Sequence, residues 1–284
     1  MAAASHDSLC GTQNEIRQLG MKKRILHWLS HPATAGLDID DPSTTALRRG
    51  IIRSKPFLQR LYLEWYGMLQ THFQPGEKIL ELGSGAGFLK ECIPDIITSD
   101  IMPVPGVDLV ADARRLPFDD LSLDGIVMVN VLHHIPDVKQ FLSEAERTLR
   151  KHGKMVMIEP WANPWTSFIH RHLHHEPFDT TPIDWLLPGM GPLSDANGAL
   201  PWIVFQRDAS LFKERCPNLN VVAIRPMMPV SYLLSGGISL RLSAPGWSYR
   251  MIRRMERLAG EKRSGMFAEI RIEKTGISAA STRM

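Results

Sequence analysis

The sequence predicts an α/β protein built on a doubly wound, mostly parallel sheet of seven strands, with N-terminal helices and a lid inserted after the fifth strand. Five short apolar runs alternate with helical or glycine-rich segments, which is the order that builds a parallel sheet. A glycine-rich turn directly follows the first run and is expected to open a helix, and right-handed crossovers place consecutive parallel strands in one sheet. The seven expected strands are residues 78–82, 96–101, 107–111, 125–131, 154–158, 220–225 and 266–273.

The segments around these strands predict the domain organisation. Residues 1–20 are polar and irregular, and we expect a disordered extension there, followed by a helical region over 21–73. Residues 74–284 form the main domain. Within it, a stretch rich in tryptophan and proline at about 160–205 is the expected lid, and a basic segment occupies about 227–263.

Capping residues indicate where individual helices begin. Asp41 followed by Pro42 is typical of a helix start, with the aspartate as N-cap and the proline in the first turn. Pro136 and Asp137 precede a second helix, which has apolar residues at helical spacing up to Leu149. A short basic amphipathic helix over 21–30 and a helix over 209–216 are also expected.

Composition excludes several classes of protein. The chain has 284 residues, of which 44% are hydrophobic and 22% charged, so it can bury a core without crosslinks. Its three cysteines lie far apart, which argues against a disulfide framework or zinc ribbon and for a reducing compartment. A net charge of +3 is too small to indicate nucleic acid as a partner. Because there is neither a membrane-length apolar run nor an apolar signal core, we expect a cytoplasmic protein.

The turn at 83–87 is the centre of the functional argument. Glycines stand at 83, 85 and 87, and Glu81 lies two residues before the first of them. Glycine is needed where backbone torsions are unusual or where a ligand must touch the main chain, and open α/β sheets bind ligands at this end of their strands. Dinucleotide-binding turns follow G-x-G-x-x-G, whereas Phe88 follows the third glycine here. A carboxylate at Glu81 would repel a pyrophosphate but suits a ligand with an amino group and a sulfonium.

The pattern (E/D)-x-G-x-G-x-G after a first strand resembles the class I methyltransferases that use S-adenosylmethionine (SAM). Residues 116–160, LPFDDLSLDGIVMVNVLHHIPDVKQFLSEAERTLRKHGKMVMIEP, resemble the type 11 branch, which includes enzymes of quinone biosynthesis and other small-molecule methyltransferases. The resemblance covers about residues 75–160. It implies a class I methyltransferase fold, SAM as the cofactor and S-adenosylhomocysteine (SAH) as its product. The cofactor-binding residues that it implies are Glu81, Gly83, Ser84, Gly85, Gly87, Asp100, Asp112, Ala113 and Asn130.

The resemblance also implies a role for each part of this set. The glycine loop would wrap the methionine part of SAM, and Asn130 would face the same part. Asp100 would bind the ribose hydroxyls, and the Asp112 carboxylate would accept a hydrogen bond from the adenine amine. Taken singly, Glu81 could instead be a solvated charge at a strand end, and the two aspartates could be helix caps.

Catalytic residues are harder to name, because methyl transfer is an in-line displacement that depends mainly on alignment. His133 and His134 follow the fourth strand, where the acceptor should enter, and either could act as a base; the alternative is that they support the loop. Glu159, after the fifth strand, faces the same edge, and a structural role suits it at least as well. The sequence after Asn130 lacks the (N/D)-P-P-(Y/F) motif of enzymes that methylate exocyclic or amide nitrogens.

Histidines and tryptophans gather in the expected lid. His170 and His174 could share a helix face and bind a metal, but no further ligand set is evident. We therefore expect no metal site, and assign His170, His172, His174, His175 and Glu176 to substrate contact or plain surface. The tryptophans at 161, 165, 185 and 202 could pack the lid on the core or line an apolar acceptor pocket.

The segment 241–263 has seven basic residues against two acidic ones, interleaved with large apolar residues. We favour a solvated helix with an ordinary core face. The alternative is a helix that lies on an anionic membrane, which would place the protein on the inner membrane face and make the acceptor lipid-linked.

The sequence therefore predicts a SAM-dependent methyltransferase that acts on a small-molecule or lipid-linked acceptor, with no nucleic-acid partner. Two alternatives are a nicotinamide-dependent oxidoreductase on a similar sheet and a non-catalytic scaffold with the same fold. The identity of the acceptor, the methylated atom and the oligomeric state stay open.

Overall fold

A computed structural model describes residues 30–276 of the protein, apart from residues 35, 174, 175, 188, 190 and 192. The expected extension at 1–20, most of the expected helix at 21–30, and His174 and His175 lie outside the described residues.

The structure has the expected seven-stranded, mostly parallel sheet, which confirms the predicted fold class. The strand order is β3-β2-β1-β4-β5-β7-β6. Strands β1 to β5 are parallel to their neighbours, whereas β7 runs antiparallel to both β5 and β6. The strands are β1 (Ile79–Leu82), β2 (Ile97–Asp100), β3 (Leu109–Val110), β4 (Leu123–Val129), β5 (Leu149–Pro160), β6 (Leu219–Met227) and β7 (Phe267–Lys274).

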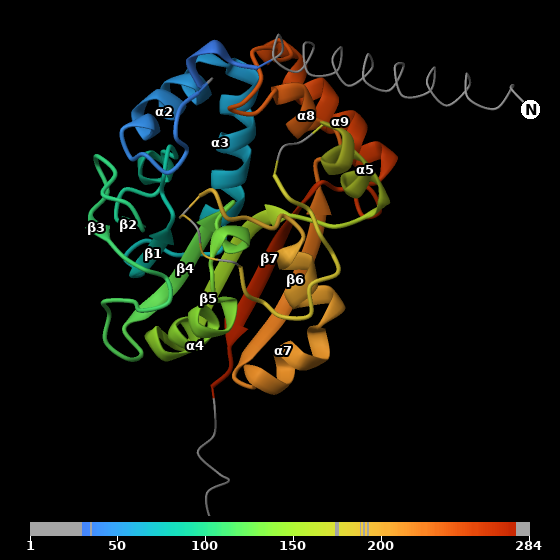
Figure 1. Ribbon diagram of the computed structural model, residues 1–284. Helices are drawn as coiled ribbons and strands as arrows, with labels where there is room; N and C mark the ends of the chain where they lie inside the picture. The colour runs from blue at the N-terminus through green and yellow to red at the C-terminus, as the bar shows by residue number, and fades with distance from the viewer. Residues whose placement is uncertain are drawn as a thin grey trace, which may run out of the picture.

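Helices cover both faces of this sheet (Figure 1). One face packs against α4, α6 and α7, and the other against α3, α8 and α9. Alternate residues along each strand contribute to the two cores: Met155 and Met157 of β5 belong to the first, and Val156 and Ile158 to the second. The helices are α2 (Thr44–Ser54), α3 (Pro56–Gln70), α4 (Val138–Thr148), α5 (Pro164–Leu173), α6 (Leu200–Trp202), α7 (Ala209–Arg215), α8 (Ser231–Ser235) and α9 (Tyr249–Ala259).

The N-terminal helical region begins later than its capping signal predicts, and it is divided in two. Helix α2 begins at Thr44, because Asp41 caps the turn before it: its carboxylate accepts a hydrogen bond from the amide of Ser43 at 2.8 Å. Lys55 is extended, with φ −108° and ψ 96°, since Pro56 disfavours a helical residue before it. Pro56 then begins α3.

The glycine-rich turn does not open an α-helix, contrary to the sequence-based expectation. The segment that follows it contains only the 3₁₀ turn η2 (Leu89–Glu91). Pro94 follows within a few residues and has no amide hydrogen to donate, so a helix started at Phe88 could not continue past it. Phe88 and Leu89 are buried instead, and pack against α3.

The expected lid packs into the core of the protein and also lines a cavity, described below. It contains α5, α6 and the π-helix η4 (Ile203–Arg207). Trp161 and Trp185 are buried in the core on the α4 side of the sheet, and Trp165 donates a hydrogen bond from its indole nitrogen to the carbonyl of Pro229 at 2.7 Å. In the part of the chain that the structure describes, no helix is both long and apolar enough to span a bilayer.

Candidate functional site

The glycine loop follows β1 and can be built only from glycine at several positions. Gly83 and Gly85 have φ values of 65° and 44°, which is the left-handed region that L side chains rarely adopt. A β-carbon on Gly87 would lie 2.8 Å from both the carbonyl oxygen of Ser84 and the hydroxyl oxygen of Tyr66. The exposed main chain of this loop therefore forms a cradle that a side chain would fill.

Glu81 lies beneath this loop and is 5% exposed. Its carboxylate accepts a hydrogen bond from the Ser84 hydroxyl at 2.7 Å. Burial raises the pKa of Glu81 to about 7, and the nearby charge of Asp100 adds to the rise. An unpaired buried carboxylate costs free energy, so a cation placed against Glu81 would be favourable.

Asp100, at the end of β2, fixes the shape of the loop. One carboxylate oxygen accepts from the amide of Gly85 at 2.9 Å, and the other from the amide of Met102 at 3.0 Å. After β3, the Asp112 carboxylate is bound by the Arg114 guanidinium at 2.7 Å, and this side-chain hydrogen bond holds the pKa of Asp112 below its usual value. A ligand that bound to Asp112 would therefore share it with Arg114.

The structure brings every predicted site residue to one cavity. All nine predicted cofactor residues, together with His133 and His134, line a single space of about 1270 Å³. A pocket for one drug-sized ligand holds roughly 300–1,000 Å³, so this cavity has room for a cofactor and an acceptor together. It opens at the carboxyl ends of the parallel strands, where α/β sheets bind ligands.

His133 and Glu159 form a buried pair in this cavity. The side chain of His133 is 2% exposed, and its Nδ1 lies 2.7 Å from Oε2 of Glu159. The other carboxylate oxygen of Glu159 accepts from the amides of Val131 and Leu132. On the far side of the ring, Nε2 of His133 lies 4.0 Å from Oε2 of Glu176. Burial alone would lower the pKa of His133, but the hydrogen bond and charge of Glu159, with the charge of Glu176, raise it.

His134 has a different environment. Its Nδ1 lies 3.0 Å from the carbonyl oxygen of Asp195, and it therefore donates its proton there. Burial, and then the charge of His133, lower the pKa of His134 to about 4. His134 stays neutral at physiological pH. The centroid of its ring lies 4.2 Å from that of His133, and the two ring planes are tilted by 41°.

One wall of the cavity is aromatic, and its rings come from elements that the sequence analysis did not assign to the site. Tyr62 and Tyr66 of α3, Tyr232 of α8 and Phe267 of β7 line it. The four tryptophans of the expected lid do not contribute to this wall, so the packing interpretation suits them better than the pocket interpretation. In the sequence, the tyrosines of α3 gave only a signal of helical periodicity, which cannot separate a core face from a cavity wall.

The sequence reasoning missed one charged residue at the site, Arg49, and left another, Glu176, open between substrate contact and plain surface. Arg49 of α2 reaches the glycine loop, with Nη2 3.4 Å from the carbonyl oxygen of Gly85. Glu176 faces His133, although the sequence placed it in the histidine cluster of the lid. His170 and His172 line the cavity, and the described residues contain no group of side chains suited to hold a metal ion.

Comparison with known proteins agrees with this geometry. The family described as methyltransferase domain matches residues 80–157, the stretch from β1 to β5 that supplies the glycine loop and His133. This part of the chain is a class I methyltransferase domain of the type 11 family.

Curated relatives share this methyltransferase domain over part of their length. The demethylmenaquinone methyltransferase of Symbiobacterium thermophilum is 30% identical over 123 residues, which are 35% of this chain and 49% of that protein. The phthiotriol/phenolphthiotriol dimycocerosates methyltransferase 1 of Mycobacterium ulcerans is 30% identical over 116 residues, 34% of this chain and 43% of that protein. The chain thus spans about half the length of the curated relatives that it matches.

A solved structure extends the likeness of fold beyond the matched domain. It is a chain from the complex between the Haloferax volcanii Trm112 methyltransferase activator and a methyltransferase. The likeness covers 84% of this chain and 97% of that one, with a TM-score of 0.53 and 14% sequence identity. At that identity it shows the fold alone.

Proposed function

We propose that the protein is a SAM-dependent methyltransferase whose acceptor is a hydroxyl group on a largely apolar, small or lipid-linked molecule. The observation that carries the proposal is that the glycine loop and the His133–Glu159 pair line the same cavity. The first suits the cofactor, and the second can remove a proton from the acceptor.

The residues at the glycine loop fit SAM. The loop forms a cradle without side chains, and the buried Glu81 carboxylate lacks a cationic partner at hydrogen-bond distance among the described residues. An amino group would meet Glu81, and the main chain of residues 83–87 would bind the rest of the methionine part. A pyrophosphate would instead meet the negative charges of Glu81 and Asp100, which argues against the nicotinamide alternative.

The chain's own residues would align the acceptor and move its proton. When bound, SAM supplies a methyl group, whose bond to sulfur breaks as its bond to the acceptor oxygen forms, leaving SAH. His133 lines the cavity, and its Nε2 would accept the hydroxyl proton. Glu159 would hold the ring in place and stabilise the imidazolium that forms. We assign His134 a supporting role, because its Nδ1 proton is held by the Asp195 carbonyl.

The walls around His133 support an apolar acceptor. Tyr62, Tyr232 and Phe267 present aromatic surface, and aromatic and apolar linings with few polar groups are typical of small-molecule sites. The names of the two curated relatives refer to a quinone and to a lipid, which agrees with this class of acceptor.

Calorimetric titration of the purified protein with SAM, SAH and NADH tests the cofactor. We expect micromolar binding of SAM and SAH, no binding of NADH, and loss of binding in Gly85→Arg. Well-folded protein that binds neither sulfur ligand would sink the proposal, and binding of NADH would favour the oxidoreductase.

Transfer from methyl-labelled SAM to phenols, quinols and lipid extracts tests the acceptor class. Turnover that His133→Asn abolishes while SAH binding is retained would support the assignment of the base. Binding of SAM without transfer to any fraction would favour the non-catalytic scaffold.

A further inference from the structure

Helix α9 (Tyr249–Ala259) lies on the protein with its polar face inward. Its buried side chains are Tyr249, Arg253 and Glu256, which are 5%, 4% and 5% exposed. The outward face is apolar. Trp247 in the preceding turn, Met251, Met255 and Leu258 are 76%, 53%, 62% and 79% exposed, and they recur at helical spacing. A surface helix of a globular protein normally has the opposite arrangement. We call these four residues the α9 stripe.

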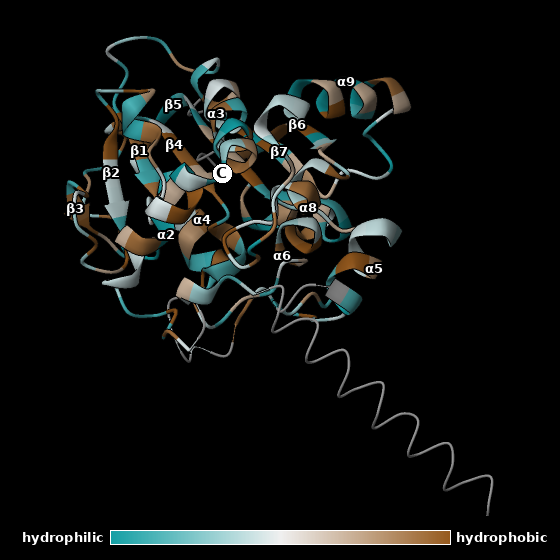
Figure 2. Ribbon diagram, turned by 90° about the horizontal axis from the view of Figure 1, so that it is seen from above, coloured by the Kyte–Doolittle hydropathy of each residue, from teal (hydrophilic) through white to brown (hydrophobic). Residues whose placement is uncertain are grey.

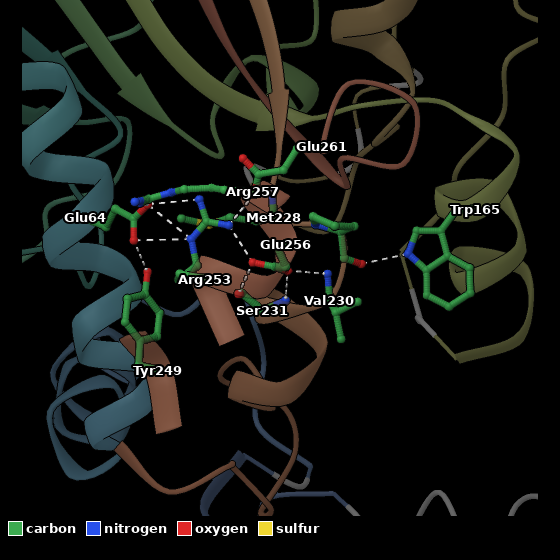
Figure 3. A network of polar contacts seen from close by, with 11 residues as sticks. Glu64, Trp165, Met228, Val230, Ser231, Tyr249, Arg253, Glu256, Arg257 and Glu261 are labelled. Atoms are coloured by element: carbon green, nitrogen blue, oxygen red, sulfur yellow. Dashed lines mark hydrogen bonds and ion pairs between the residues drawn. The ribbon is translucent and has the colours of Figure 1, made fainter. Parts of the chain in front are cut away.

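A network of ion pairs fixes this orientation (Figure 3). The Arg253 guanidinium lies 2.9 Å from the Glu64 carboxylate of α3 and also binds Glu256 and Glu261. Tyr249 donates a hydrogen bond to Glu64 at 2.7 Å. Because leaving one buried charge without its partner is strongly destabilising, rotation of α9 to bury the stripe would be costly. The outward position of the stripe is therefore a built feature of the fold.

The same network removes negative charge from the outer surface. Between residues 241 and 263 the acidic residues are Glu256 and Glu261. Glu256 is buried, and the carboxylates of both turn inward to Arg253. Arg250 and Arg254 remain exposed beside the stripe. Within 247–258 the outer face thus combines large apolar side chains with positive charge alone.

We propose that the α9 stripe and its flanking arginines dock the protein on an anionic lipid surface. Trp, Met and Leu side chains suit the boundary between headgroups and acyl chains. Each Arg near an anionic leaflet adds an electrostatic attraction. A second copy of the chain is a poorer occupant, because a two-fold contact between the stripes would place Arg250 and Arg254 of both copies together.

The docking surface is joined to the cavity through a short stretch of chain. Gly237 to Leu240 line the cavity, and Leu242, two residues later, is 55% exposed. Helix α9 lies at the periphery of the molecule (Figure 2). Docking would bring this wall of the cavity close to the lipid. The proposal does not depend on the proposed function, since it rests on α9 alone.

Flotation of the full chain with vesicles tests the docking. One set is phosphatidylcholine alone, and the other contains about one third phosphatidylglycerol, which imitates an anionic leaflet. We expect binding to the anionic vesicles that falls as salt rises. The triple variant Met251→Gln, Met255→Gln, Leu258→Gln should weaken binding about tenfold or more, because it removes most of the inserted apolar surface. Arg250→Gln with Arg254→Gln should reduce the preference for anionic lipid.

Two controls separate docking from folding and from cofactor binding. Ile183→Gln alters another exposed apolar side chain, 88% exposed and far from α9 in the sequence, and should leave vesicle binding unchanged. SAH affinity should be the same in the triple variant and the original chain. Absence of binding to anionic vesicles, or equal binding to both sets, would overturn the proposal. Concentration-dependent dimerisation that the triple variant abolishes would assign the stripe to a second copy instead.

Discussion

Nδ1 of His133 lies 2.7 Å from Oε2 of Glu159, and the two side chains are 2% and 0% exposed. Such burial would be unfavourable for an imidazolium without a partner. The carboxylate reverses that preference, so the pair stabilises positive charge on a ring whose other nitrogen lies 4.0 Å from Oε2 of Glu176. The arrangement resembles the general pattern in which a carboxylate orients a histidine base.

The pair makes stability depend on pH. The folded-state pKa of His133 is raised above its unfolded value, so its contribution is fully present below about pH 6.5 and is lost as pH rises through the folded pKa. Glu159→Gln keeps an acceptor for the amides of Val131 and Leu132 but removes the charge. We expect the variant to lose more stability in urea at about pH 6 than at about pH 9.

A matched control uses the exposed pair of His152 and Glu273, whose atoms lie 3.2 Å apart with side chains 72% and 40% exposed. Exposed ion pairs contribute about 0–1 kcal/mol, so Glu273→Gln should change stability little at either pH. Titration of the His133 imidazole by NMR gives the direct readout. An unchanged His133 pKa in Glu159→Gln would contradict the electrostatic role of the pair.

Glu81 predicts a pH dependence of cofactor binding. Its pKa of about 7 in the free protein should fall when an ammonium group binds beside it, so binding releases a proton below that pH. SAH affinity should rise about tenfold per pH unit below about pH 6.5 and level off above about 7. Calorimetry in two buffers of different ionisation enthalpy measures the released proton.

Glu81→Gln should abolish this proton release and bind SAH with an affinity that varies little between about pH 5.5 and 7. Glu77→Gln, an exposed carboxylate before the same strand, should behave like the original chain. A proton release that persists in Glu81→Gln would assign the titration to another group.

Replacement by alanine should have opposite effects on stability at Gly87 of the glycine loop and at Gly67 of α3. A β-carbon on Gly87 would lie 2.8 Å from the Ser84 carbonyl oxygen and from the Tyr66 hydroxyl, and overpacking of this kind costs about 1–3 kcal/mol. A β-carbon on Gly67, inside α3, would meet nothing within 4 Å, and alanine is favoured over glycine there by about 1 kcal/mol. Urea unfolding should show Gly87→Ala destabilised and Gly67→Ala stabilised. Equal effects would contradict the tight cradle.

The sheet and the glycine loop could be predicted because their signals are local. Buried parallel strands appear as apolar runs, and a turn in the left-handed region requires glycine at Gly83 and Gly85. The ends of the strands were predicted less accurately. Strand β5 begins at Leu149, directly after α4, although the next two residues, Arg150 and Lys151, are polar. Leu149 pairs with Leu123 of β4, and the pairing resumes at Lys154 after an irregularity in register. Such pairing is not visible in a single sequence.

The cavity and the α9 stripe could not be predicted, because they depend on which face of a helix meets the core. Residues 241–263 suggested a helix with an ordinary core face, and this prediction was wrong. Arg253 and Glu256 are buried because Glu64, distant in the sequence, supplies their partner. Hydrophobic periodicity locates an apolar face but cannot show that an ion-pair network holds it outward.

Arg49 predicts how the protein recognises the carboxylate of the cofactor. Its Nη2 lies 3.4 Å from the carbonyl oxygen of Gly85, and its buried Nε has no hydrogen-bond partner among the described residues. Guanidinium groups pair well with carboxylates. Arg49→Gln should weaken the binding of SAM by about ten- to a hundredfold, since hydrogen bonds to charged groups contribute about 1.5–3 kcal/mol. The affinity for decarboxylated SAM, which keeps the ammonium and sulfonium groups but lacks the carboxylate, should fall little in the same variant.

Comparing SAM with decarboxylated SAM separates recognition of the carboxylate from damage to the glycine loop, because a distorted loop would lower the affinity for both ligands equally. Arg53→Gln is the matched control, since Arg53 lies on the same helix but forms an exposed pair with Glu91. It should leave both affinities unchanged. If Arg49→Gln weakens SAM and decarboxylated SAM to the same extent, Arg49 supports the Gly85 carbonyl and does not bind the carboxylate.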